Sequence, residues 1–220
     1  MKQDGDLRTI AAWEIVSIVS TALLTEWAIL SVGGGNRWLL VFPFAVAFAY
    51  IFVSQRAWRE TARDLGWRRD NFLEALRLLA LPMLLVSVVF IIYGYLNGQL
   101  DFSKWLKGRT ILGLPVFGLL WGLVQQYVLQ GFINRRAQVI WGKGWRSILL
   151  VAVLFGVLHL PNPALTAATF LGGLIWAAVY QRAPNLYALA LSHAFMTWVL
   201  ISTLSPQTLH GLRVGYKFFG

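Results

Sequence analysis

The run Ser147–Gln181, SILLVAVLFGVLHLPNPALTAATFLGGLIWAAVYQ, contains 35 residues without a single charge. Three further charge-free windows cover residues 78–100, 110–134 and 183–212. A membrane-spanning helix needs about 20 mostly apolar residues, so each window is long enough to cross a bilayer. Charged residues make up 13% of the chain, whereas a soluble domain carries about 25%. The sequence therefore predicts an all-α, polytopic transmembrane helical bundle.

The breaks between apolar windows predict about seven spans in a single integral membrane domain over residues 1–220. The 35-residue run is too long for one span, and Pro161 and Pro163 divide it because proline removes a helix donor. The expected spans cover residues 10–32, 38–54, 76–96, 111–133, 147–160, 164–181 and 186–204. A basic loop is expected after the fourth span, formed by Arg135, Arg136, Lys143 and Arg146.

The net charge of +10 reflects 19 Lys and Arg residues against nine acids. The basic residues lie between apolar spans, as they do in cytoplasmic loops, so no nucleic-acid partner is expected. A cytoplasmic N-terminus places 13 basic residues on the inner side and six on the outer side. The charges thus predict an integral protein of the cell (inner) membrane with its N-terminus in the cytoplasm.

All nine acids lie at or before Asp101, so the polar groups in the later spans are neutral. They are Gln125, Gln126, Gln130, His159, His193 and Thr197. Intramembrane polar residues usually face a cavity or the bundle interior, although hydrogen bonding between helices is the alternative interpretation. Gln126 and Gln130 are four residues apart and share a helix face. We expect Gln126, His159 and His193 to line one cavity, with Gln130 nearby.

Three segments resemble the CAAX-protease and bacteriocin-processing (CPBP, Abi) family of intramembrane peptidases. They are QQYVLQGFINRR (125–136), LFGVLH (154–159) and LSHAFMT (191–197). That family shows Glu-Glu-x-x-x-Arg, Phe-x-x-x-His and His-x-x-x-Asn motifs on successive transmembrane helices. Phe155 and His159 match the second motif, and His193 matches the histidine of the third. The resemblance covers residues 60–200, approximately.

The chain departs from the family at its acidic motif. Gln125 and Gln126 occupy the Glu-pair positions, Gln130 replaces the arginine, and Thr197 replaces the asparagine. The resemblance implies that a motif Glu activates water while the histidines position it or stabilise the oxyanion. A glutamine amide cannot accept the proton of that water. The resemblance therefore implies either an endopeptidase for membrane-associated or lipidated peptides with an altered base, or a non-catalytic relative. Such a pseudoenzyme would bind a hydrophobic peptide or another membrane protein.

Several alternatives stay open from the sequence. Glu14 or Glu26 of the first span could substitute as the base, as could one of the histidines, which titrate near neutral pH. The resemblance also allows a divalent metal, for which His159 and His193 are the candidate ligands. Two histidines make a poor zinc site, because zinc usually takes at least three protein ligands. A transporter is disfavoured by the absence of a sequence repeat.

Overall fold

The computed structural model of this protein describes residues 2–33, 36–105 and 113–220. Within these ranges the chain is helical and has no strand, which confirms the predicted fold class. Six helices are long and apolar enough to cross a membrane: Gly5–Val32, Trp38–Ala57, Phe72–Leu96, Val116–Trp141, Pro163–Arg182 and Leu186–Thr203. The shorter apolar helix Trp145–Val157 brings the number close to the predicted seven. The predicted start of the fourth span, at residue 111, lies outside the described ranges.

The helices follow one another in this order along the chain. The elements are α1 (Lys2–Leu24), η1 (Thr25–Ile29), α2 (Leu30–Val32), η2 (Arg37–Leu40), α3 (Val41–Ala57), α4 (Phe72–Leu96), η3 (Phe102–Trp105), α5 (Gly113–Gln126), η4 (Tyr127–Asn134), α6 (Arg135–Trp141), α7 (Trp145–Val157), α8 (Pro163–Arg182), α9 (Leu186–Thr203), α10 (Pro206–Leu209), η5 (His210–Leu212) and η6 (Gly215–Phe219).

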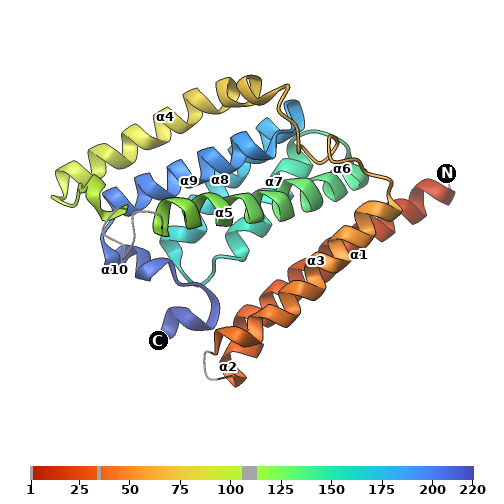
Figure 1. Ribbon diagram of the computed structural model, residues 1–220, viewed down its shortest axis with the longest axis horizontal. Coiled ribbons are helices and arrows are strands. Elements are labelled where there is room, and N and C mark those ends of the chain that lie inside the picture. Colours follow the sequence, from red (N-terminus) through yellow and green to blue (C-terminus); the bar gives the residue numbers. More distant parts are fainter. Residues whose placement is uncertain (1, 34–35, 106–112) are drawn as a thin grey trace.

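Helix α9 packs between α4 and α5, and α8 packs on α7 and also contacts α4 (Figure 1). Small residues let these helices approach closely. Gly173 of α8, for example, packs directly on the backbone of Ala152 in α7. Helices α1 and α3, which we call the N-terminal hairpin, lie at a steep angle to this bundle (Figure 1). The hairpin therefore diverges from α5 along its length.

The prediction of a basic loop after the fourth span is wrong for Arg135 and Arg136. The chain continues as a helix through Arg135 and Arg136 to Trp141, and the Arg136 side chain is completely buried. Arg136 Nε forms an ion pair with Glu14 of α1, and its Nη1 lies 2.9 Å from Glu60 Oε1. These two acids neutralise the guanidinium, so it can remain inside the protein rather than in a solvated loop.

Further contacts complete this ion cluster, which comprises Glu14, Ser54, Glu60, Arg135 and Arg136. Arg136 Nη2 donates to Ser54 Oγ at 3.0 Å, and Ser54 Oγ donates to Glu14 Oε1 at 2.5 Å. Arg135 Nε donates to Glu60 Oε1 at 2.5 Å. Because Glu14 and Ser54 belong to the two helices of the hairpin, the cluster fastens the hairpin to α6.

The hairpin has a second attachment at its other end. Residues 205–220, which we call the tail, fold back so that Gly215 contacts Glu26 and the Phe219 ring lies 6.2 Å from the Trp27 ring. The hairpin is thus held by the ion cluster at one end and by the tail at the other.

We predict that Arg136→Gln strongly destabilises the protein, because it leaves Glu14 and Glu60 buried without a counter-charge. Removing one partner of a buried ion pair costs about 3–5 kcal/mol. The measurement is thermal unfolding of the purified protein in detergent micelles.

The matched control is Arg63→Gln. Arg63 pairs with Asp70 at 2.6 Å in the connection between α3 and α4, and its side chain is 66% exposed. Such exposed pairs contribute about 0–1 kcal/mol. Equal melting temperatures for the two variants would show that the ion cluster does not hold the hairpin.

Candidate functional site

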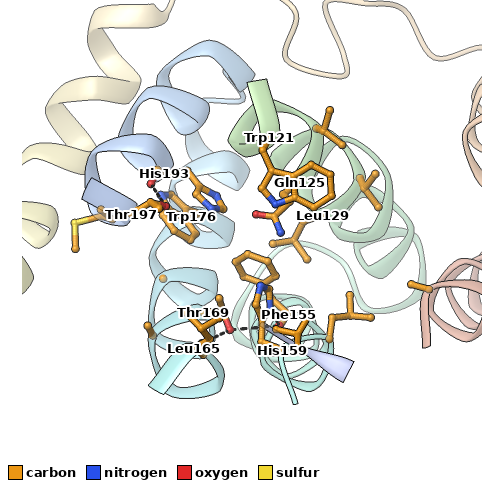
Figure 2. A pocket seen from close by; sticks show the side chains of 18 of the residues that line it. Trp121, Gln125, Leu129, Phe155, His159, Leu165, Thr169, Trp176, His193 and Thr197 are labelled. Carbon is orange, nitrogen blue, oxygen red and sulfur yellow. Dashed lines mark hydrogen bonds between the residues drawn. The ribbon is translucent and has the colours of Figure 1, made fainter. Parts of the chain in front are cut away.

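A cavity of about 570 Å³ lies between the N-terminal hairpin and helices α5, α8 and α9 (Figure 2). Its wall is mostly apolar, with contributions from both helices of the hairpin and from the tail. The polar residues among those described in the wall are Thr21, Glu26, Gln125, His159, Thr169, His193 and Thr197. The cavity is therefore a hydrophobic space among the candidate membrane-spanning helices, with a few polar groups.

The ring of His193, on α9, is fixed from two sides. The indole of Trp176, on α8, stacks on it with centroids 4.7 Å apart and planes within 4°. Gln126 Nε2 lies 3.1 Å from His193 Nδ1. An amide nitrogen donates, so in this arrangement Nδ1 accepts and the proton of the neutral ring is on Nε2. In this tautomer the Nε2 atom of His193, a residue of the cavity wall, is an N–H donor.

His159 has the opposite tautomer. It lies in the turn after α7, and its Nδ1 is 2.7 Å from the carbonyl oxygen of Phe155. A carbonyl only accepts, so Nδ1 carries the proton and Nε2 keeps its lone pair. The Phe155 ring makes edge contacts with both histidine rings, at 4.9 Å from His159 and 6.0 Å from His193. The two histidines therefore offer one acceptor and one donor on either side of Phe155 (Figure 2).

The adjacent glutamines of α5 have different environments. Gln125 lines the cavity together with His159, His193 and Thr197. Gln126, which we expected in the wall, is completely buried behind it and contacts His193 from there. Adjacent residues of a helix point about 100° apart, and α5 is turned so that Gln125 faces the cavity and Gln126 faces His193 of α9. The sequence did not reveal which of the two faces the cavity.

Gln130 belongs to a separate buried network rather than to the cavity wall. Its Oε1 accepts from Asn134 Nδ2 at 2.7 Å, and Asn134 Oδ1 accepts from Gln181 Nε2 at 3.1 Å. Thr197 lines the cavity, but its hydroxyl donates to the His193 carbonyl at 3.0 Å. Tyr127–Asn134 form a π-helix, a rare geometry that recurs at functional sites. Nothing in the sequence pattern indicated it.

Of the two acids that could substitute as the base, one lies outside the cavity wall and the other lies at the tail end of the cavity. Glu14 is engaged by Arg136 in the ion cluster and is not among the described residues of the wall. Glu26 does line the cavity, on η1, where it contacts the tail at Gly215. Glu26 therefore lies at the tail end of the cavity, about 18 Å along the helix from Glu14.

The described residues contain no group of three or more His, Cys, Asp or Glu side chains that could hold a metal ion. His159 and His193 already use their Nδ1 atoms in the contacts above. Two remaining ring nitrogens are fewer than the three protein ligands that zinc usually takes. The residues in this part of the chain therefore do not fit the divalent metal that the family resemblance allowed.

Two supporting residues were missed by sequence reasoning. Trp176 orients His193 by stacking, and no local pattern distinguishes it from the other tryptophans. Asn162 is completely buried and its Oδ1 accepts from the backbone N–H of Leu165, which caps the start of α8. The signal for Asn162 was available, because Asn before Pro is typical of a helix N-terminus.

Comparison with known proteins gives a family for the part of the chain that carries these residues. Residues 105–199 match the family model described as "Rce1-like: Type II CAAX prenyl endopeptidase Rce1-like". No curated protein and no solved structure matches the chain. The matched residues run through α5, α7 and α8 and most of α9, and they include Gln125 and both histidines. This match confirms the predicted resemblance, because residues 105–199 are similar to the Rce1-like, type II CAAX prenyl endopeptidase family.

Proposed function

We propose that the cavity binds the apolar part of a lipidated or hydrophobic peptide, and that the protein does so without efficient hydrolysis. The family match and the apolar wall support a membrane-associated peptide as ligand. The 13-to-6 distribution of basic residues supports a place in the cell membrane with the N-terminus in the cytoplasm.

The histidine pair suits a peptide group. A peptide bond offers one N–H donor and one carbonyl acceptor. His159 Nε2 is an acceptor because Nδ1 donates to a carbonyl, and His193 Nε2–H is a donor when the Gln126 amide nitrogen faces Nδ1, as it does here. A peptide backbone at the polar part of the cavity can thus be held by both rings, while its apolar part occupies the rest of the space.

The position of Gln125 in the cavity wall is the observation that supports the proposed absence of efficient hydrolysis. It stands in the cavity wall with both histidines, at a position where the family resemblance implies a glutamate. A carboxylate there would take a proton from water, whereas the amide cannot. A positioned general base contributes about 10²- to 10⁴-fold in rate. Glu14 cannot supply it, because it is bound to Arg136.

We predict that Gln125→Glu creates or raises peptidase activity by about 10²-fold or more, since it places a carboxylate at the motif position in the cavity wall, whereas the acid already present there, Glu26, lies at the tail end. Gln126→Glu is the matched control, because Gln126 is adjacent in sequence but completely buried. The measurement is mass-spectrometric detection of cleavage of a peptide that carries an S-prenylated cysteine. His193→Ala in the Gln125→Glu background should remove the gain.

Wild-type cleavage as fast as that of Gln125→Glu would contradict the proposal. If His159→Ala then abolished the wild-type activity, the base would be His159 rather than a carboxylate.

We also predict that Ala168→Trp lowers the affinity for a fluorescent S-prenylated cysteine peptide by tenfold or more. Ala168 lines the cavity on α8, so an indole there would fill the space that the ligand needs. Ala167→Trp is the control, because Ala167 is exposed on the same helix and is not in the described wall. Equal affinity of both variants in a fluorescence-anisotropy titration would place the binding site outside the cavity.

A further inference from the structure

The tail closes the end of the cavity that lies away from the ion cluster. Leu212 and Val214 are both part of the cavity wall. The chain reaches this position through three consecutive residues with positive φ, namely His210 at 46°, Gly211 at 60° and Leu212 at 59°. Two of these are not glycine, and L residues occupy this region only at an energetic cost. Strained backbone of this kind points to a specific role for the segment.

Several contacts hold the tail in place. The buried Asn162 Nδ2 donates to the carbonyls of Leu209 at 2.9 Å and Arg213 at 3.1 Å. The Gly215 N–H donates to the carbonyl of Leu160 at 2.9 Å. Leu160 and Asn162 belong to the turn that carries His159, so the tail is fastened directly to the candidate site.

The tail is also fitted closely to the N-terminal hairpin. A Cβ atom at Gly215 would stand 2.9 Å from both the Cβ and the carbonyl oxygen of Glu26, closer than such atoms approach. Gly215 has a φ of 57°, which glycine adopts without strain. Only glycine suits this position, and the tail therefore bridges the hairpin and the His159 turn across the end of the cavity.

The space between His193 and the tail has a defined length. Trp176, which stacks on His193, and Leu165, which packs with Leu204 and Leu209 near Val214, are 11 residues apart on α8. At the helical rise this corresponds to about 16 Å. The α8 wall between them combines the small residues Ala168, Thr169 and Gly172 with the larger Leu171 and Ile175. A hydrocarbon chain can lie along this wall until it meets Leu212 and Val214.

We propose that the tail acts as a length gauge, in which Leu212 and Val214 set the longest hydrocarbon chain that the cavity accepts. The inference rests on the proposed function, since it concerns the same ligand and the same cavity. Each methylene group buried in the cavity raises the affinity about fourfold. The affinity therefore increases with chain length until the chain reaches the tail, and then stops increasing.

The test uses S-alkyl N-acetylcysteine methyl esters with straight alkyl chains of increasing length as probes. Their affinities are measured by competition with a fluorescent S-prenylated cysteine peptide on the full-length protein in nanodiscs. Leu212→Ala should move the length limit upward by about two methylene groups, with about tenfold tighter binding of probes just beyond the wild-type limit. Leu212→Trp should move the limit downward. Tyr216→Ala is the control, because Tyr216 is exposed on the same tail and is not in the described wall.

The possible failures can be told apart. If neither the fluorescent peptide nor any probe binds the wild-type protein, the proposed function fails and the gauge fails with it. If the probes bind but the limit is the same in wild type and Leu212→Ala, the gauge alone is wrong. Leu212→Ala only removes atoms from a side chain that is 38% exposed, so we expect the variant to fold. Its length limit therefore tests the gauge even if Leu212→Trp lowers the melting temperature.

Discussion

A guanidinium that has lost all contact with water stays charged only if anions replace the water. Arg136 meets this condition through Glu14 and Glu60, and the shape of the protein depends on that pairing. The pair fixes one end of the N-terminal hairpin against α6, while the tail fixes the other end. Between these two attachments the hairpin diverges from α5 (Figure 1). Both helices of the hairpin contribute to the wall of the cavity.

The same electrostatics explain why Glu14 does not belong to the site. Glu14 is one of the two acids that could have replaced the motif glutamate as the base. It neutralises Arg136 instead, so it is not available to the histidines. The motif positions themselves hold amides, and these fit imperfectly: Gln126 Oε1 and Gln130 Nε2 are buried without a hydrogen-bond partner among the described residues. These motif positions leave a binding cavity without a carboxylate beside its histidines.

Much of the fold followed from the sequence because lipid requires long apolar helices, and the charge-free windows revealed them. Arg136 was misplaced because its partner Glu14 lies 122 residues away, and local sequence shows a cation without its anion. Gln126 was preferred over Gln125 because it shares a helix face with Gln130. Residue spacing does not show how α5 is rotated about its axis, since packing on α9 sets that rotation. The tail was passed over for a similar reason, since its role comes from contacts with Leu160 and Asn162 rather than from its own composition.

The central claim is that a lipidated peptide occupies the space between the N-terminal hairpin and α8. The most direct measurement is photo-crosslinking with an S-alkyl cysteine peptide that carries a diazirine at the end of its alkyl chain, followed by mass spectrometry of the labelled protein. The account predicts saturable labelling of cavity-wall residues in the hairpin, α8 and the tail, with Leu212 among the labelled positions. Labelling confined to lipid-facing residues outside the cavity wall, such as Leu84 and Leu85 of α4, or labelling that unlabelled peptide does not compete away, would contradict it.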